Sequence, residues 1–425
     1  MPKFRILVFP CGSEIGLEIY RSLKYSSHVE LFGASSVDDH GRFVYKNYIE
    51  NVPFVDDPFF IVKIKELVNK YNIEAIYPTM DKVIWKLKTN EHNIGCKIIA
   101  SSATTTEICL SKQSTYNQLK SVIKVPTIYN FNSVHNFPVF IKPIIGYGSR
   151  NTILAKNKND LITFFNNRRI EEYLITEYLT GEEFTIDCFT DKEGALRFIG
   201  PRIRNRISNG ISVNTKPVCD INNEFKTMAE LINECLDFRG AWFFQLKKDS
   251  GGELTLLEIA SRLGGSSSLY RGKGINFALL SIFDAFNYNV EIIENDYQIE
   301  LDRSLNSRFK INIEFDTVYV DYDDCLIINN EINIQLVSFL FKAINEKKKL
   351  VLISKHEGDL DKELSKYRLN TLFDKIIHIG KGSKKFEYID DLSSIFIDDS
   401  FMERKEVKEK LNIPVFSQDM IEILL

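Results

Sequence analysis

Two aspartates near the C-terminal end of the chain have a spacing that phosphate chemistry can use. The apolar run Val318–Val320 leads directly into Asp321, and Asp323 follows two residues later. Side chains at positions i and i+2 of an extended chain point the same way, so one carboxylate could attack phosphorus while the other protonates the leaving oxygen. A strand that merely ends in a polar turn would carry the same acids, and the pair alone leaves both interpretations open.

Further polar residues stand at two later strand ends, and two lysines lie between those ends. They are Ser354, Lys384, Lys385, Asp398 and Asp399. Together with the aspartate pair, these elements follow the order of the motifs in the haloacid dehalogenase (HAD) superfamily. Residues from about 312 to 425 therefore resemble a HAD phosphatase, and the ordered set is far more specific than the pair alone.

This resemblance implies a role for each residue. Asp321 would be the nucleophile, Asp323 the general acid and base, and Ser354 a hydrogen-bond donor to the phosphate. Lys385, with Lys384 as its rival, would neutralise the aspartyl phosphate. The magnesium ligands expected from the resemblance are Asp321, Asp323, Asp398 and Asp399.

Two neighbouring residues depart from the usual HAD pattern. Cys325 stands where threonine is usual, and Asp324 stands where glycine is common. We expect at most a modest loss of rate from the cysteine, because that side chain supports the attacking residue and is not itself the attacker. The short spacers between the motifs leave no room for a large cap domain, and an open site accepts a bulky or tethered substrate.

A second group of candidate residues lies in the middle of the chain. Phosphoryl transfer from a triphosphate needs surrounding cations, a mobile cover, metal-binding carboxylates and a slot for the base. Lys112 begins a predicted helix, and Lys142 ends a predicted strand just before the glycine-rich segment Gly146–Arg150. Each feature alone is more often a surface lysine or an ordinary turn, whereas their ordered combination points to a nucleotide site.

Three more features continue this order. The segment Thr176–Phe184 offers a strand whose backbone could pair with adenine, and Glu183 within it could reach ribose hydroxyls. Gln245 and Glu258 lie on successive predicted strands and supply the hard oxygen ligands that suit magnesium.

With these features in order, residues 1 to about 300 resemble an ATP-grasp enzyme. Val139–Pro143 with Gly146–Arg150 resembles the lysine and glycine-rich loop of that superfamily, and Glu258–Gly265 resembles its metal and substrate segment. The resemblance implies Mg²⁺, or Mn²⁺ in its place, at Gln245 and Glu258. It implies ATP contacts for Lys112, Lys142, Gly146, Gly148, Ser149, Glu177, Tyr178, Leu179 and Glu183.

The residues that follow Glu258, the glutamate expected to bind the metal, also point to a subfamily of ATP-grasp enzymes. Arg262 would face the acyl phosphate or the phosphate being transferred. Many ATP-grasp enzymes have asparagine where this chain has Ala260, and alanine cannot bind a metal. The form E-I-A-x-R-x-G-G is familiar among amide-forming ligases, so we interpret Ala260 as a mark of that subfamily.

A run of alternating arginines suggests where a substrate would bind. Arg202, Arg204 and Arg206 occupy every second position, which places them on one face of an extended strand, and Ser212 follows nearby. Guanidinium groups in such an array can clamp carboxylates or phosphates. A solvated strand face would look the same, but similar ATP-grasp ligases place arginines at the acceptor site, and we favour substrate binding.

The elements that hold these residues have an α/β pattern, with short β-branched runs alternating with amphipathic stretches. We expect an α/β multidomain protein: a Rossmann-like domain at residues 1–103, an ATP-grasp domain of α+β type at 104–300, and a small HAD-like Rossmannoid domain without a large cap at 312–425. A hinge is expected at residues 291–308. Among the expected strands are Leu196–Pro201, Thr317–Asp321 and Ser394–Ile397. The first glycine turn, Gly12-x-x-x-Gly16, lacks the GxGxxG spacing of a dinucleotide site.

Composition excludes several function classes. The 425 residues include 44% hydrophobic and 26% charged residues, with a net charge of −4, which gives no drive toward nucleic acid or membrane. The longest apolar runs, such as Ala278–Phe283, are far shorter than the roughly 20 residues of a membrane span. Seven scattered cysteines without a CxxC pair indicate a reducing compartment, and we expect a cytoplasmic protein.

The combined hypothesis is a bifunctional enzyme. An ATP-dependent ligase would join a small-molecule carboxylate to an amine through an acyl phosphate, and a magnesium-dependent phosphatase would act on a phosphorylated amine or on the amide product. A homodimer is possible by analogy with other ATP-grasp ligases. The alternatives are an ATP-grasp kinase or a carbamoyl-phosphate-synthase-like enzyme, and a nucleotide sensor with degenerate sites.

Overall fold

The computed structural model describes residues 3–146, 148, 150–208, 210–304 and 311–425, and the expected ATP contact Ser149 lies outside them. The chain forms two compact units, Met1–Leu305 and Asn306–Leu425. Residues 1–103 and 104–300, which the sequence assigned to two separate domains, both lie in the first unit. None of the helices in the described part of the chain has the length and apolar character that a bilayer span requires.

The first unit begins with a five-stranded parallel sheet of order β3-β2-β1-β4-β5. Alternate residues of the central strand serve two cores: Ile6 and Val8 pack on the side of α1, and Leu7 and Phe9 on the side of α2 and α3. The elements are β1 (Phe4–Phe9), α1 (Glu14–Leu23), β2 (Val29–Ala34), β3 (Asn47–Ile49), α2 (Phe60–Tyr71), β4 (Ala75–Pro78), α3 (Asp81–Thr89), α4 (Glu91–Ile94) and β5 (Lys97–Ile98).

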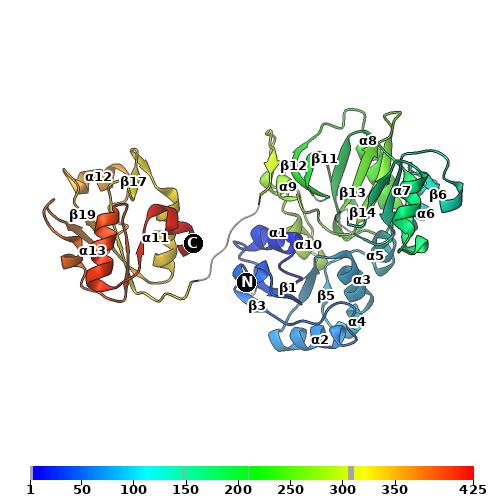
Figure 1. The fold of residues 1–425 in the computed structure, drawn as a ribbon. Coiled ribbons are helices and arrows are strands. Elements are labelled where there is room, and N and C mark those ends of the chain that lie inside the picture. Colours follow the sequence, from blue (N-terminus) through cyan, green and yellow to red (C-terminus); the bar gives the residue numbers. More distant parts are fainter. Residues whose placement is uncertain (1–2, 147, 149, 209, 305–310) are drawn as a thin grey trace. The chain divides into compact units, whose positions relative to one another are not determined.

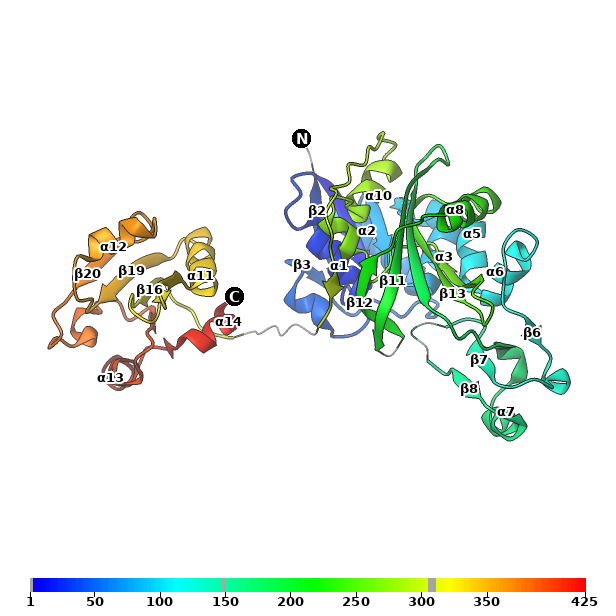
Figure 2. The ribbon, with the colours of Figure 1, turned by 90° about the horizontal axis from the view of Figure 1, so that it is seen from above.

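Two antiparallel sheets follow. A four-stranded sheet has the order β6-β9-β7-β8, and a six-stranded sheet has the order β14-β13-β10-β11-β12-β15. Figure 2 shows the smaller sheet with α7 standing apart from the larger one. The smaller sheet contains β6 (Ile128–Tyr129), β7 (Val139–Pro143), β8 (Ile153–Ala155) and β9 (Tyr173–Glu177), with α7 (Lys158–Phe165).

The larger sheet is covered on one face by α8, which packs on β10 and β11 (Figure 1). On its other face, α9 and α10 share a hydrophobic core with the N-terminal sheet. The elements of this part are α5 (Ala103–Leu110), α6 (Lys112–Leu119), β10 (Glu183–Thr190), β11 (Leu196–Ser208), β12 (Ile211–Pro217), α8 (Glu224–Cys235), β13 (Gly240–Lys248), β14 (Leu254–Ala260), α9 (Ser268–Gly272), α10 (Phe277–Ala285) and β15 (Leu301–Asp302).

The expected hinge at residues 291–308 is for the most part built into the first unit. Ile292 and Ile299 pack against the core that the N-terminal sheet shares with α9 and α10. Leu301 then pairs with Thr215 across β15 and β12. Apolar residues spaced through a mostly polar segment thus attach it to the unit, and the first unit extends to Leu305.

The second unit is a parallel five-stranded sheet of order β20-β19-β16-β21-β22. Its central strand is buried along its whole length, as the continuous apolar sequence of a parallel strand requires. The elements are β16 (Thr317–Val320), β17 (Ile327–Ile328), β18 (Glu331–Ile332), α11 (Ile334–Asn345), β19 (Lys349–Ser354), α12 (Leu360–Lys366), β20 (Lys375–His378), β21 (Ser394–Ile397), α13 (Phe401–Leu411), β22 (Val415–Phe416) and α14 (Ile421–Leu424).

Candidate functional site

In the first unit, two adjoining cavities lie where the smaller and larger antiparallel sheets approach each other. The narrower cavity has a volume of about 170 Å³ and the wider one about 960 Å³. They share lining residues, among them Lys112, Arg204 and Glu258. All the described residues expected to contact ATP line the narrower cavity: Lys112, Lys142, Gly146, Gly148, Glu177, Tyr178, Leu179 and Glu183.

Lys142 is a buried lysine on β7, and its amine faces this cavity. Its Nζ lies 2.6 Å from the hydroxyl of Tyr116 and 3.4 Å from the carbonyl oxygen of Leu257. Burial, helped by the nearby charge of Lys112 and opposed by Glu258, lowers the pKa of Lys142 from the usual 10.5 to about 7. A phosphate anion bound beside this amine would strongly stabilise its protonated form.

Lys112 is positioned by the start of α6. The Ser111 side chain caps that helix by accepting a hydrogen bond from the Ser114 amide, 3.2 Å away, so Lys112 is the first helical residue. Its Nζ donates to the carbonyl oxygen of Gly146, 2.9 Å away. The lysine thereby reaches the glycine-rich segment that follows Lys142.

The predicted adenine and ribose residues are on β9 and β10. The Glu177 carboxylate accepts a hydrogen bond of 2.7 Å from the backbone amide of Thr127. The Glu183 carboxylate contacts the guanidinium of Arg204. Leu179 is buried, whereas Tyr178 is 37% exposed and can form one wall of an open slot.

The expected metal pair is brought together by strand register. Gln245 and Glu258 lie directly opposite each other on the antiparallel strands β13 and β14, and both line the two cavities. The Gln245 oxygen accepts a hydrogen bond of 3.0 Å from Arg204. Two adjacent oxygen donors beside a cavity lined by lysines are a donor set that fits Mg²⁺ in the company of phosphate.

The arginine array is split between the wider cavity and the sheet edge. Arg202 and Arg204 line the wider cavity, and Arg202 is buried with its Nε 2.6 Å from Asp187. The expectation that Arg206 shares their face is not met. The strand pairing shifts register between Arg204 and Arg206, and the Arg206 guanidinium turns outward to Asp302 at 2.6 Å. Ser212 also lines the wider cavity.

Arg262 also lines the wider cavity. Its guanidinium makes two hydrogen bonds, of 2.8 and 3.0 Å, to the Asp81 carboxylate at the start of α3. This bidentate pair joins the N-terminal sheet domain to the segment after β14. The direction of the guanidinium is therefore set by Asp81, a residue the sequence interpretation missed.

Other residues of this site also escaped the sequence interpretation. Tyr116 fixes the Lys142 amine, and Glu14 and Arg303 form an ion pair at the wall of the wider cavity. Asp81 and Glu14 each stand just after the carboxyl end of a parallel strand, which is a recognisable signal. Tyr116 lies in the short polar helix α6, which has no such signal.

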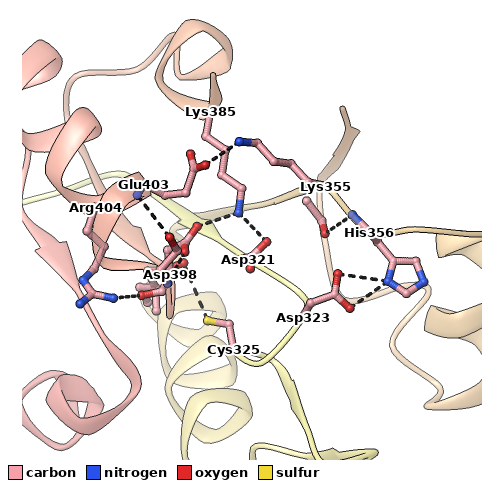
Figure 3. Close-up of polar contacts among 12 residues, drawn as sticks. Asp321, Asp323, Cys325, Lys355, His356, Lys385, Asp398, Glu403 and Arg404 are labelled. Carbon is pink, nitrogen blue, oxygen red and sulfur yellow. Dashed lines mark hydrogen bonds and ion pairs between the residues drawn. The ribbon is translucent and has the colours of Figure 1, made fainter. Parts of the chain in front are cut away.

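In the second unit, the carboxyl ends of β16, β19 and β21 gather the residues predicted for phosphate chemistry. Lys385 Nζ lies 2.6 Å from Asp321 Oδ1 and 2.6 Å from Asp398 Oδ2. Figure 3 shows the Lys385 amine in contact with both carboxylates. All three side chains are buried. Lys384 instead points outward to Glu406, so Lys385 is the lysine of this cluster.

Burial controls the ionisation of this cluster. Burial raises the pKa of Asp321 to about 7, with the Lys385 charge opposing the rise and Asp398 adding to it. Burial likewise raises the pKa of Asp398. Burial alone would lower the pKa of Lys385, but the two aspartates outweigh it and raise that pKa. The cluster thus holds one buried cation between two buried acids.

The same cluster offers a cation site. Carboxylate oxygens of Asp321, Asp398 and Asp399 lie within 4.8 Å of one another. This all-oxygen donor set fits Mg²⁺. The Asp323 carboxylate, expected to join them, instead contacts His356 at 2.8 Å, because it lies on the loop beyond the strand end and turns toward the loop after β19.

The remaining predicted residues flank the cluster. Ser354 is fully buried, and its Oγ accepts a hydrogen bond of 3.1 Å from the His356 amide. The Cys325 Sγ lies 3.9 Å from the carbonyl oxygen of Ile397. Asp324 has a φ of 51°, in the left-handed region that favours glycine, the residue that the HAD resemblance leads one to expect there.

Comparison with solved structures defines the class of fold. The biotin carboxylase domain of the Hydrogenobacter thermophilus 2-oxoglutarate carboxylase, in complex with MgADP, ADP and bicarbonate, matches with a TM-score of 0.58 and 14% identity, over 70% of this chain and 72% of that one. N5-carboxyaminoimidazole synthetase from Staphylococcus aureus matches with a TM-score of 0.57 and 19% identity, over 69% and 81%. L-amino acid ligase from Bacillus licheniformis matches with a TM-score of 0.54 and 14% identity, over 69% and 75%. The protein thus has an ATP-grasp fold.

A more particular similarity concerns part of the chain. Residues 169–304 match the family described as "ATP-grasp in the biosynthetic pathway with Ter operon". No curated protein matches the chain. The matched segment runs from just before β9 to the end of the first unit and contains Glu183, Gln245, Glu258 and Arg262.

Proposed function

We propose that the first unit is an ATP-dependent carboxylate–amine ligase. The observation that carries this proposal is the Lys142 amine facing a cavity whose other wall carries the Gln245–Glu258 pair. Such an arrangement can hold a triphosphate between cations and oxygen ligands. The E-I-A-x-R-x-G-G segment and the structural likeness to an amino acid ligase support the choice of bond.

In the proposed reaction, a carboxylate oxygen of the substrate attacks the γ-phosphorus of ATP, and the bond from that phosphorus to the ADP oxygen breaks. The amine nitrogen then attacks the acyl carbon, phosphate leaves with the carbon–oxygen electron pair, and the nitrogen loses a proton. Lys142 and Lys112 would hold the phosphates, and Arg262 would stabilise the anionic oxygens of the acyl phosphate.

ATP and Mg²⁺ are the cofactors of this proposal, supported by the ADP and magnesium in a structural relative. When bound, Mg²⁺ would neutralise phosphate charge during transfer. Gln245 and Glu258 are the residues that would hold it. A homodimer is part of the proposal because that relative is described as a dimer.

The ligase assignment is tested with Lys142→Ala. The variant is expected to lose ADP formation that depends on a carboxylate and an amine, because the buried cation beside the phosphates is gone. Lys120→Ala, at the exposed residue that directly follows α6, serves as the control. Normal ADP formation by Lys142→Ala would exclude the proposed site.

For the second unit we propose a magnesium-dependent phosphatase of the HAD type. The observation in its favour is Lys385 bridging Asp321 and Asp398 at the carboxyl ends of adjacent parallel strands. An Asp321 oxygen would attack the substrate phosphorus, and the departing oxygen would take a proton from Asp323. Water would then lose a proton to Asp323 and attack the same phosphorus, breaking its bond to Asp321.

Mg²⁺ held by Asp321, Asp398 and Asp399 would supply charge neutralisation for the phosphoryl oxygens. The substrate proposed for this unit is the phosphorylated amine or the amide made by the ligase. The test is release of inorganic phosphate from amine phosphates by the full chain. Asp321→Asn should abolish this release while leaving ADP formation intact, and unchanged release would exclude Asp321 as nucleophile.

A further inference from the structure

His356 lies on the loop after β19, two residues beyond the buried Ser354. Its Nδ1 is 2.8 Å from Asp323 Oδ1 and 3.1 Å from Asp323 Oδ2, although 33 residues separate the two side chains in sequence. Figure 3 shows the Asp323 carboxylate turned toward the imidazole ring. Nothing in the proposed phosphatase reaction yet uses this histidine.

Both the backbone and the ring of His356 are held in place by neighbouring residues. The backbone carbonyl oxygen of His356 accepts a hydrogen bond of 2.8 Å from His378 Nε2. The backbone amide of His356 donates a hydrogen bond of 3.1 Å to Ser354 Oγ. The ring packs edge-on against Tyr322, with centroids 5.2 Å apart. The two hydrogen bonds attach the backbone of residue 356 to the ends of β19 and β20, and the Tyr322 contact holds the ring itself beside the end of β16.

Asp323 is much less constrained by its own surroundings. Its side chain is 51% exposed, whereas that of His356 is 17% exposed. A carboxylate oxygen accepts hydrogen bonds, so we take Nδ1 of His356 as the donor in this contact. Without this contact, a half-exposed aspartate on a loop would sample several rotamers, and displacement of a reacting group by about 1 Å can cost about 100-fold in rate.

We propose that His356 is a positioning residue for Asp323, fixing the carboxyl group that transfers protons in the phosphatase reaction. This inference rests on the phosphatase function proposed above. His356 acts through Asp323 and does not itself touch the phosphorus. Its loss should therefore harm only the steps in which Asp323 moves a proton.

Two substrates that differ in their leaving group separate this role from general damage. The nitrophenol of p-nitrophenyl phosphate departs as a stable anion, whereas the alcohol of p-nitrobenzyl phosphate needs a proton as it leaves. In the first turnover of the full-length His356→Ala variant with Mg²⁺, release of p-nitrobenzyl alcohol should fall at least about 10-fold and release of nitrophenol less than about 3-fold. The wild-type chain, measured alongside, gives the reference for both.

A matched pair of variants tests which ring nitrogen matters. The amide nitrogen of asparagine occupies nearly the place of Nδ1, and that of glutamine nearly the place of Nε2. His356→Asn should therefore restore most of the release of p-nitrobenzyl alcohol, and His356→Gln should not. Equal rescue by both, or by neither, would overturn the positioning role.

A double-mutant cycle with Asp323→Asn completes the test. If His356 acts through Asp323, then His356→Ala should have no further effect on the release of p-nitrobenzyl alcohol in the Asp323→Asn background. Additive losses, or equal loss on both substrates, would overturn the inference while leaving the phosphatase function standing. A wild-type chain that hydrolyses neither substrate would overturn the phosphatase function and the inference together.

Discussion

Replacing Lys142 by methionine should make the first unit more stable and change how its stability depends on pH. The folded protein holds this amine at a pKa of about 7, against 10.5 in an unfolded chain. A tenfold change in a protonation equilibrium corresponds to about 1.4 kcal/mol, so keeping the amine protonated in the fold costs on the order of 5 kcal/mol. Methionine has a similar length and carries no charge, and it avoids this penalty.

The direction of this pH dependence follows from the number of protons that the folded and unfolded chains bind. Because the pKa is lowered on folding, the unfolded chain binds more protons than the folded one between pH 7 and 10.5, and stability rises with pH in that window. Between pH 7 and pH 9 the wild type should gain about 2 kcal/mol relative to Lys142→Met. The advantage of the methionine variant is therefore largest at and below pH 7 and shrinks as pH rises.

Tryptophan fluorescence during urea unfolding can measure this difference in the intact chain. Both tryptophans, Trp85 and Trp242, belong to the first unit, so the signal does not follow the second. The control is Lys120→Met, at an exposed position, which should keep the pH profile of the wild type. A difference between wild type and Lys142→Met that stays constant from pH 7 to 9, or grows with pH, would refute the reasoning.

The other predictions concern single charges in the two sites. Lys385→Met leaves two buried aspartates without their cation and should destabilise the second unit by about 3–5 kcal/mol at pH 7. Hydrogen exchange of the β16 and β21 amides measures this loss of stability, and unchanged protection of those amides would contradict the prediction. Glu258→Gln should weaken Mg-ATP binding, measured by calorimetry, at least about 10-fold. The exposed control Glu253→Gln should leave this affinity unchanged. Equal affinities of Glu258→Gln and the wild type would remove Glu258 from the metal site. Arg262→Lys cannot keep the bidentate contact to Asp81. It should slow ADP formation at least about 10-fold with little effect on Mg-ATP affinity. A rate of ADP formation like that of the wild type would show that the guanidinium geometry is unimportant.

Local sequence patterns predicted most strands of both sites because those strands are buried and apolar. The expected strands Thr317–Asp321 and Ser394–Ile397 agree with β16 and β21 to within one residue. The expected strand Leu196–Pro201 is too short, since β11 continues to Ser208. Its second half is rich in arginine, and its strand geometry comes from pairing with β12, which apolar periodicity does not report.

Side-chain direction was harder to predict than strand position. Adjacent lysines are indistinguishable in the sequence, and only the short helical turn at residues 385–388 turns Lys385 inward and leaves Lys384 at the surface. A register shift sends Arg206 out of the cavity that Arg204 lines. Contacts such as His356 with Asp323 depend on two loops meeting, and no spacing along one segment encodes them.

The central claim is that the first unit joins a carboxylate to an amine at the expense of ATP. The most direct test is ADP release by the Asp321→Asn chain with Mg-ATP and pooled carboxylates, with and without pooled amines and amine phosphates. Removing the Asp321 nucleophile keeps the second unit from consuming phosphorylated substrates or products. ADP release that requires both an acid and an amine, together with a new amide mass, is the predicted result. ADP release with a single substrate and no amine would contradict it.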